Sequence, residues 1–571
     1  MSKSFFLIPA VLSALLVSML AAALPAPARA CTTMIVTPGA SADGSMLVAH
    51  SDDDELGDQR LIFVPARDHA PGDMRKVFQE HYRYPRLTDA SRAKAYAVEG
   101  AAMAALLGEI PQPAHTYAYF DGNYGIMNER QLMIGECTDG AKFEPETGPG
   151  RMFYTSELSR LALERCATAR EAVQFMGGII EKYGYYSTGE TLLVADPHEA
   201  WVMEMCALPD AELPAAWAAQ RVPDGHVFVA ANEFRIRDLI PGNADQMSAP
   251  GLREALARLG WWKEAGPVDW LRAVSHGEYN HPYYSLRRVW RVMDRVAPSR
   301  KFSPWVEDGF TRAYPFSLKP DAKLSVADVT ALYRDHYEGT EFDMSQGLAA
   351  GPFASPNRYL GPYDGNQNDV SDKKDMFGAW ERPISVFYQG YTYVCQGRSW
   401  LPDSIGGVLW FAPDVSYTSV FMPMYAGANG ISEALSIGDP QGPQRDGAWW
   451  PFNFVANWAR LRFNLMYHDD ILPLQQALEA VAFADQPKVE DEALRLWKKK
   501  PGIETAHLTA YGMATANRVL AAWRSLADRL VVKYADGYVN LPDKLEEPGY
   551  PRWWLDRVGY GKGPVTYARP Q

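Results

Sequence analysis

The segment Ala28-Arg29-Ala30-Cys31-Thr32-Thr33 divides the sequence into an apolar leader and a long mixed chain. In the leader, a single lysine precedes an apolar run over residues 5–24 that carries no charge. Prolines then end the run, and Ala28-Arg29-Ala30 supplies the small-x-small pattern of a signal-peptidase site. The sequence therefore predicts a signal peptide over residues 1–30, export to the periplasm or the medium, and a mature chain that begins with Cys31.

Two other interpretations of the leader stay open at this point. An apolar run of about 20 residues is long enough to anchor a protein in a bilayer, but no positive cluster follows it. A lipoprotein would carry a lipid on its first cysteine and would have a blocked amine, but Ala28 and Arg29 fit the usual lipoprotein motif poorly. No later run is long enough to span a membrane, so we expect no stable membrane insertion after cleavage.

Cleavage after Ala30 would give Cys31 both a nucleophile and a base. The thiol can attack a carbonyl carbon, and the free α-amino group, whose pKa is ordinarily about 7.7–8.0, can accept the thiol proton directly or through a water. Most cysteines in strands are simply buried, but a position directly after a cleavage site reverses that expectation. The sequence therefore predicts Cys31 as a catalytic nucleophile that export activates.

Composition and missing motifs exclude several classes of function. The net charge of the 571-residue chain is −13 and no basic stripe is visible, which disfavours nucleic acid as a partner. The five cysteines form no C-x-x-C pair, the 11 histidines show no H-E-x-x-H spacing, and no G-x-S-x-G motif occurs. These absences disfavour a zinc site, a thioredoxin-type redox site, a metallopeptidase and a serine hydrolase of the G-x-S-x-G type. The sequence leaves open whether the remaining cysteines pair: Cys137, Cys166, Cys206 and Cys395.

Apolar periodicity predicts antiparallel sheets with interspersed helices. A strand over 32–36, a turn at Asp43-Gly44 and a strand over 46–49 place the first mature residue in a sheet. A helix is predicted over 169–183, ended by Gly184. Further strands are expected over 191–196, 200–205, 227–231, 405–412 and 419–423, and helices over 472–483 and 506–534. This order is typical of an α+β fold, and we expect an enzyme domain over 31–460 with a helical region over 461–571 packed on it.

Short motifs follow Cys31 in a characteristic order. Cys31-Thr32-Thr33 is followed by Ala-x-x-Asp-Gly-Ser at residues 40–45. Similar short segments lie at 128–129, 163–172, 182–185, 195–201, 221–225, 287–290, 405–408 and 421–427. Their order over most of the mature chain resembles that of the dipeptidase A-type enzymes of peptidase family C69, in the N-terminal nucleophile (Ntn) hydrolase superfamily.

This resemblance implies a four-layer αββα sandwich of two facing antiparallel sheets, and a peptidase that hydrolyses dipeptides without a metal or cofactor. A more distant similarity to bile-salt and penicillin V acylases implies roles for single residues. Cys31 would form a thioester with the substrate, and Asn232 would stabilise the oxyanion. Arg287, or its neighbour Arg288, would be a buried arginine of the site. Asp53 would hold the Cys31 ammonium group or the amine of the substrate.

Three further positions are assigned to substrate binding by the same resemblance. Asp52 is the alternative to Asp53. His50 occupies the position of an arginine that is common in the relatives. A histidine could replace the charge of that arginine only while it is protonated, and His50 could instead adjust the reactivity of the Cys31 thiol. Thr138 or Cys137 would line the site from a second pair of strands.

Two other functions fit the same residues. An acylase acting on N-acyl amides, such as penicillin V, bile-salt conjugates or acyl-homoserine lactones, would use the same Cys31 chemistry with an apolar tunnel. A dipeptidase needs a negative charge that binds the free α-amine of its substrate. The acidic segment 52–55 could supply this charge, which favours a dipeptidase over an acylase. A non-catalytic exported binding protein on the same scaffold would also be rich in aromatic residues, as this chain is. We expect small peptides as partners, and the sequence leaves the oligomeric state open.

Overall fold

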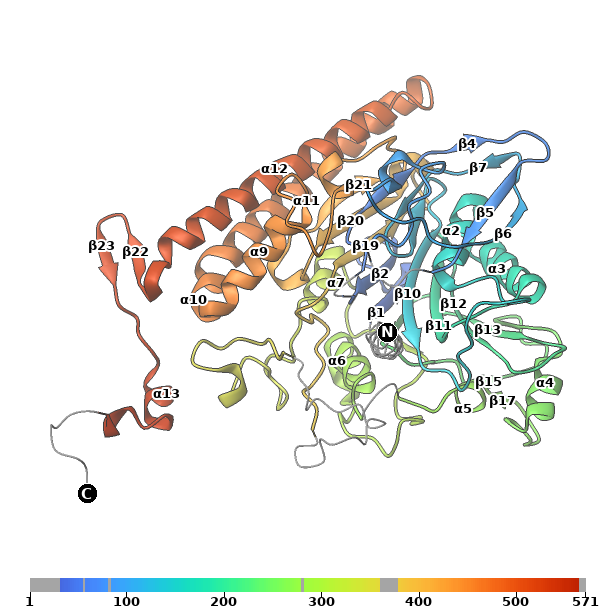
Figure 1. The fold of residues 1–571 in the computed structure, drawn as a ribbon, viewed down its shortest axis with the longest axis horizontal. Helices are drawn as coiled ribbons and strands as arrows, with labels where there is room; N and C mark the ends of the chain where they lie inside the picture. The colour runs from blue at the N-terminus through green and yellow to red at the C-terminus, as the bar shows by residue number, and fades with distance from the viewer. Residues whose placement is uncertain (1–30, 55–56, 81–83, 279–281, 360–377, 564–571) are drawn as a thin grey trace, which may run out of the picture.

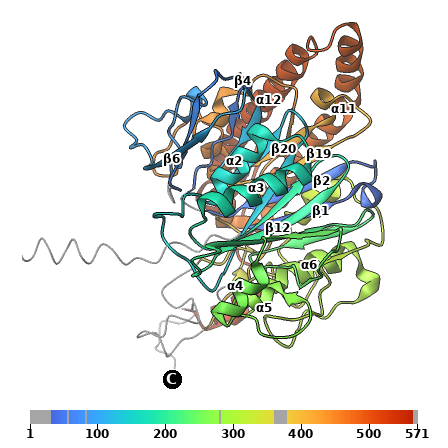
Figure 2. The same cartoon turned by 90° about the vertical axis from the view of Figure 1, so that its right-hand side faces the viewer.

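The computed structural model describes residues 31–54, 57–80, 84–278, 282–359 and 378–563 (Figure 1). The predicted signal peptide, and Glu55 of the acidic segment, lie outside the described residues. Two large sheets occupy the centre, and neighbouring strands in each of them run antiparallel. Helices cover the outer faces of these sheets (Figure 2).

Within the described residues, the first sheet has seven strands and the second has eight. The first sheet has the order β18 (Ser317–Leu318), β14 (Val227–Ala230), β1 (Thr32–Val36), β2 (Met46–Asp52), β19 (Tyr391–Gly397), β20 (Val408–Pro413) and β21 (Met422–Tyr425). The second has the order β16 (Gln246–Ser248), β13 (Ala215–Arg221), β12 (Ala200–Ala207), β11 (Gly189–Ala195), β10 (Met133–Asp139), β9 (Gly125–Asn128), β8 (Tyr119–Asp121) and β3 (Ile62–Val64). The two predicted N-terminal strands are confirmed, and β2 is longer than expected.

Alternating side chains of the central strands pack into two different cores. Successive side chains of a strand point to opposite faces of its sheet. Ile35 therefore lies in the core shared with the second sheet, whereas Met34 and Leu47 lie on the other face, against α6 (Leu286–Val296) and α7 (Val326–Leu332). Both faces of the first sheet are thus buried, which explains why β1 and β2 are fully buried along their length.

The two sheets face each other where β1 and β2 contact β10 and β11. A Cβ atom at Gly135 of β10 would lie 2.5 Å from the Thr33 hydroxyl oxygen and 3.2 Å from a methyl carbon of Val48. Only a residue without a side chain fits this spacing, so Gly135 sets the separation of the sheets here. His50 of β2 also joins the sheets, because its Nδ1 lies 2.8 Å from the carbonyl oxygen of Glu136 in β10.

Helices α2 (Thr155–Arg165) and α3 (Ala169–Tyr183) pack on the second sheet (Figure 2). The bounds of α3 match the prediction. Thr168 caps its N-terminus by accepting the Glu171 N–H, and Gly184, with φ at 77°, ends it. Local capping residues therefore fixed this helix.

The C-terminal region is helical, as predicted. Helices α11 (Leu472–Lys499) and α12 (Thr505–Lys533) pack together, and both contact β21, while α9 (Trp449–Ala459) packs on α12 (Figure 1). Helix α11 runs well past its predicted end although Pro487 lies inside it. The predicted strand over 405–412 is wrong at its start, because the short helix α8 (Asp403–Gly406) follows Pro402 and β20 begins only at Val408.

Smaller elements complete the described chain. Strand pairs are β4 (Arg67–Asp68) with β7 (His115–Thr116), β5 (Met74–Phe78) with β6 (Leu106–Pro111), β15 (Asp238–Leu239) with β17 (Val268–Asp269), and β22 (Val539–Leu541) with β23 (Lys544–Glu546). Further helices are α4 (Leu252–Leu259), α5 (Trp270–Val274), α10 (Phe463–Leu465) and α13 (Arg552–Arg557).

The structure confirms antiparallel sheets mixed with helices and a helical C-terminal region. The assignment of these sheets to the Ntn-hydrolase sandwich, and the division into residues 31–460 and 461–571, stay predictions. All five cysteines are buried with free thiols. None of the helices in the described part of the chain combines the length and the apolar character that a bilayer crossing requires.

Candidate active site

Most of the predicted site residues gather where β1, β2 and β10 meet between the two sheets. Thr32 pairs with Ser51 across β1 and β2, so Cys31 lies beside the end of β2. The sulfur of Cys31, a ring nitrogen of His50 and a carboxylate oxygen of Asp52 all lie within 4.8 Å of one another. Cys31 is only 2 % exposed. The antiparallel register alone therefore brings three chemically active side chains together.

Arg288 holds the backbone of the predicted nucleophile. It projects from α6, and its Nη1 donates to the Cys31 carbonyl oxygen at 2.7 Å and to the Thr32 hydroxyl at 3.0 Å. Its Nη2 donates to Oδ1 of Asn232 at 2.7 Å and to the Ala231 carbonyl oxygen at 3.2 Å. One guanidinium group thus fixes the start of β1 relative to the end of β14.

Arg287 does not reach this cluster, although we predicted it there from the sequence. Its guanidinium carbon lies 3.7 Å from the ring centroid of Phe342 and 4.1 Å from that of Tyr283. Its Nε lies 3.3 Å from a carboxylate oxygen of Glu381. Adjacent residues on an α-helix point about 100° apart, so only one of the two arginines can face Cys31. The structure places Arg288, the alternative, in that position.

Asn232 connects the end of β14 to β10. Its φ is 63°, a left-handed conformation that asparagine tolerates better than most residues. Its backbone N–H donates to the Cys137 sulfur at 2.6 Å, and its Nδ2 donates to the Thr138 carbonyl oxygen at 2.6 Å. Both residues that we expected to line the site from the second pair of strands therefore contact Asn232.

Asp53 points to a different partner from Asp52. Its Oδ2 lies 2.6 Å from Nη2 of Arg382, and the Arg382 guanidinium also lies over the rings of Tyr284 and Tyr388. Burial raises the pKa of Asp53 to about 6, against the opposing effect of Arg382 and Arg288. Arg382 could not be predicted as the partner of Asp53, because it lies more than 300 residues downstream of Asp53 and belongs to no motif.

Asp52 and Glu136 carry buried carboxyl groups close to the thiol. Asn123 donates from Nδ2 to Asp52, and Thr138 donates from its hydroxyl to Glu136 at 3.0 Å. Burial raises the pKa of Asp52 well above its ordinary value, with Arg86 opposing. Burial, and then the neighbouring Glu190, raise the pKa of Glu136 likewise. Glu136 was missed, although a glutamate inside the otherwise uncharged start of strand β10 is a visible signal.

The thiol and the imidazole are both neutral in this environment. Burial raises the pKa of the Cys31 thiol well above its ordinary value, and Glu136, Asp52 and Asp53 add to the effect. Burial lowers the pKa of His50 to about 3. The cationic role considered for His50 is therefore not available near neutral pH, and the thiol needs a base to become a nucleophile.

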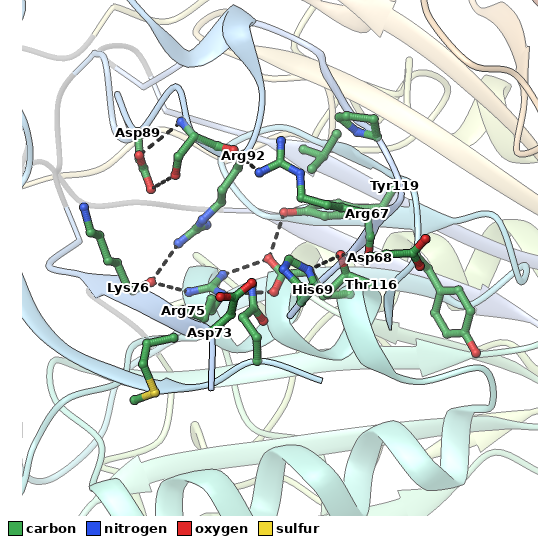
Figure 3. A pocket seen from close by; sticks show the side chains of 17 residues that line it. Arg67, Asp68, His69, Asp73, Arg75, Lys76, Asp89, Arg92, Thr116 and Tyr119 are labelled. Carbon is green, nitrogen blue, oxygen red and sulfur yellow. Dashed lines mark hydrogen bonds and ion pairs between the residues drawn. The ribbon is translucent and has the colours of Figure 1, made fainter. Parts of the chain in front are cut away.

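A separate cavity of about 370 Å³ lies beside β4, β5 and α2 (Figure 3). None of the predicted site residues lines it. Arg75 lies 2.5 Å from Glu157 and 3.0 Å from Glu164, and Arg92 lies 2.9 Å from Glu157. These arginines and glutamates form ion pairs with one another, whereas Asp52 and Glu136 beside Cys31 accept hydrogen bonds from the uncharged side chains of Asn123 and Thr138.

Comparison with known proteins agrees with the sequence motifs. The model of peptidase family C69 matches residues 30–473. A "Probable dipeptidase" of Salmonella dublin is 28% identical over 432 residues, which cover 72% of this chain and 84% of that protein. A "Probable dipeptidase" of Latilactobacillus sakei is 25% identical, covering 71% and 76%, and a "Dipeptidase" of Bifidobacterium longum is 26% identical, covering 69% and 71%. The chain belongs to peptidase family C69.

Proposed function

We propose that this protein is an exported cysteine-type dipeptidase of the Ntn-hydrolase type, with Cys31 as its nucleophile. The observation that carries the proposal is the position of Cys31 at the start of a central strand, beside His50 and Asp52, with its carbonyl held by Arg288. The family match begins one residue before Cys31, which supports a mature chain that starts there. The dipeptidase names of the relatives support the substrate class.

In this proposal, removal of residues 1–30 frees the α-amine of Cys31. The amine takes the proton of the thiol, and the sulfur attacks the carbonyl carbon of the peptide bond. The tetrahedral intermediate collapses, and the leaving amino acid takes the proton from the Cys31 ammonium group. A water then attacks the thioester with the same amine as base, which releases the first amino acid and regenerates the thiol.

Asn232 is the proposed donor to the oxyanion. An amide side chain at this position would stabilise the negative oxygen of the tetrahedral intermediate, and the loss of such a donor typically costs about 10²–10³ in rate. Its Nδ2 donates to the Thr138 carbonyl oxygen at 2.6 Å. Arg288 fixes the other end of the amide through Oδ1, so the orientation of the amide is set before substrate arrives.

The buried carboxyl groups favour a dipeptide over an N-acyl substrate. In a dipeptide, the α-ammonium nitrogen is two bonds away from the carbonyl carbon that the sulfur attacks, so its counter-charge must lie close to the sulfur. Asp53 is already paired with Arg382. Asp52 and Glu136 are bonded to neutral donors, Asn123 and Thr138. We therefore assign recognition of the substrate amine to Asp52 and Glu136.

The arrangement of the layers supports the Ntn-hydrolase assignment. Helices α2 and α3 cover the second sheet, the two sheets face each other, and α6 and α7 cover the first sheet. This is the order of layers that the resemblance implies. In an Ntn hydrolase, the first residue of the mature chain lies at a strand terminus between the sheets, as Cys31 does here.

The first test is the N-terminus of the exported protein. Mass spectrometry or Edman sequencing of the protein recovered from the periplasm or the medium should read Cys-Thr-Thr with an unmodified amine. A different first residue, or a lipid on that nitrogen, would remove the proposed base and refute the mechanism.

The second test separates the dipeptidase from the two alternatives. A free dipeptide should be hydrolysed, and its N-acetylated form should be hydrolysed far more slowly because it lacks the ammonium group. Equal or faster cleavage of the acetylated form would favour the acylase. Absence of hydrolysis in both, together with tight binding of peptides, would favour the binding protein.

A further inference from the structure

Three potential metal ligands lie on one face of two adjacent strands. His50 and Asp52 are two residues apart on β2, so their side chains share a face. The pairing of Thr32 with Ser51 places Cys31 next to Asp52. All three residues are buried, and one potential ligand atom of each lies within 4.8 Å of the other two. The rigid strands therefore bring a sulfur, an imidazole nitrogen and a carboxylate oxygen together.

The orientation of the His50 ring points independently to a ligand. Its Nδ1 lies 2.8 Å from the Glu136 carbonyl oxygen, which can only accept, so the ring proton is on Nδ1 and the lone pair is on Nε2. Among the described residues, no hydrogen-bond partner faces this buried Nε2. A histidine that binds a metal typically donates its other ring N–H to a backbone carbonyl or a carboxylate. The hydrogen bond that holds His50 is of this kind.

From these observations we propose that Cys31, His50 and Asp52 form a binding site for a thiophilic divalent cation of the Zn²⁺ type. Thiolate, imidazole and carboxylate are the ligand types that Zn²⁺ prefers, with bonds of about 2.0–2.3 Å. Such bonds in a tetrahedral site hold the ligand atoms roughly 3.3–3.8 Å apart. Because the present separations are all within 4.8 Å, the side chains need to close by at most about 1.5 Å. The carboxyl group of Glu136 lies close to the Cys31 thiol and can ionise when a cation binds, whereas Asp53 is already paired with Arg382.

Binding replaces the thiol proton by the metal. The Cys31 thiol and M²⁺ give a metal thiolate and one proton, which is released to the solvent, and no redox step is involved. The fourth position of the metal is filled by water or, in a chain that begins at Cys31, by the α-amine, which closes a five-membered N,S chelate. The metal would block the nucleophile, and this inhibitory consequence rests on the proposed function. The binding itself does not, and the test below measures binding.

The test is a titration of the purified mature chain with Co²⁺, followed by displacement with Zn²⁺. One equivalent of Co²⁺ should produce a sulfur-to-cobalt charge-transfer band in the near ultraviolet, and Zn²⁺ should remove it. The band should be absent in Cys31→Ser. His50→Gln and Asp52→Asn should each weaken binding at least about tenfold, because even the loss of an outer-shell partner costs about 10–100-fold. Cys395→Ser is the matched control, since Cys395 is a buried thiol on β19 outside this cluster, and it should bind as the wild type does.

A second measurement needs no variant. Zn²⁺ should protect Cys31 from alkylation in the wild-type protein, with peptide mapping as the readout. A charge-transfer band that persists in Cys31→Ser, unchanged affinity in both His50→Gln and Asp52→Asn, or alkylation of Cys31 at saturating Zn²⁺ would each overturn the proposal. Dipeptide hydrolysis does not enter these readouts, so failure of the proposed function would be seen separately.

Discussion

Ionisable side chains are buried in two regions of this molecule, and the regions differ in how their buried carboxyl groups are paired. Beside the cavity of Figure 3, Arg75 and Arg92 neutralise Glu157 and Glu164. Burial acts to raise the pKa of Glu157, but Arg75 and Arg92 outweigh it and hold the pKa well below its ordinary value. Around Cys31, in contrast, burial raises the pKa of Glu136 and its neighbour Glu190 raises it further. Paired charges in the first region build structure, whereas in our proposal the carboxyl groups Asp52 and Glu136 of the second region receive the ammonium group of a substrate.

The largest effect is expected at the nucleophile. Cys31→Ala should lower kcat/KM for a dipeptide by at least about 10⁴, because removal of a nucleophile abolishes covalent catalysis and leaves only binding and oxyanion stabilisation. Cys395→Ala, a substitution of an equally buried cysteine, should keep the activity of the folded protein. Comparable losses in the two variants would mean that packing, and not the chemistry of Cys31, explains the effect.

A substitution in the region where Arg75 pairs with Glu157 and Glu164 should change the unfolding free energy and not the catalytic rate. Arg75→Met leaves Glu157 and Glu164 without one of their cations, and breaking a buried ion pair from one side typically costs about 3–5 kcal/mol. We expect urea unfolding to show a loss of that size, while the folded variant keeps its kcat. Glu136→Gln should behave in the opposite way, with a small change in unfolding free energy and a raised KM for dipeptides. If both variants lost mainly stability, the distinction between the two regions would be wrong.

Arg288 and Arg287 form a matched pair on one helix. Arg288→Lys cannot reproduce the four hydrogen bonds to Cys31, Thr32, Ala231 and Asn232. The loss of charged hydrogen bonds worth about 1.5–3 kcal/mol predicts a decrease in kcat of roughly 10–100-fold. Arg287→Lys should change kcat little, because its side chain packs on Phe342 and Tyr283. Steady-state kinetics of both variants checks this prediction. A larger decrease in kcat for Arg287→Lys than for Arg288→Lys would indicate that Arg287, and not Arg288, contributes to the site.

The last prediction concerns a buried carboxyl group outside both regions, and it affects stability and not activity. Burial raises the pKa of Asp414 to about 6, although Asn453 and Arg460 oppose the shift. The folded protein therefore holds a proton that the unfolded chain has already lost, so stability falls as pH rises from about 4 to about 6, by up to about 1.4 kcal/mol per pH unit. Asp414→Asn should remove this dependence and be relatively more stable above pH 6. Asparagine tolerates the φ of 60° at this position. The measurement is the unfolding free energy of both proteins as a function of pH. If it changed with pH in the same way in the wild type and in Asp414→Asn, Asp414 would be ionised throughout and the prediction would be wrong.

Local patterns predicted the local structure well. The cap at Thr168 and the glycine at 184 bound α3 at the predicted residues. A run of residues that favour strands, followed by an Asp-Gly turn, predicted β1 and the start of β2. The family resemblance assigned Cys31, His50 and Asp52 to one site, and the hairpin register of β1 and β2 is what brings them together in the structure. Each of these predictions depends on interactions between residues that are close in sequence.

The parts that the sequence did not predict depend on distant packing. Which of two adjacent arginines faces Cys31 is set by the rotation of α6 on the first sheet, and no pattern within residues 287–290 reports that rotation. Arg382 reaches Asp53 from far along the chain. The metal site that we propose has no counterpart in a sequence motif, because Cys31 and His50 come from different strands and their spacing matches no known signature.

Gly135 has no functional group, yet it limits how the proposed active site can vary. Its missing side chain admits the Thr33 hydroxyl at a distance where any Cβ atom would collide. We expect an alanine there to push β10 outward and to move Glu136, Cys137 and Thr138 away from Cys31. The tolerance of this cluster to mutation therefore depends partly on a residue without a side chain, and a family member with a larger residue at this point would need a compensating loss of volume at Thr33 or Val48.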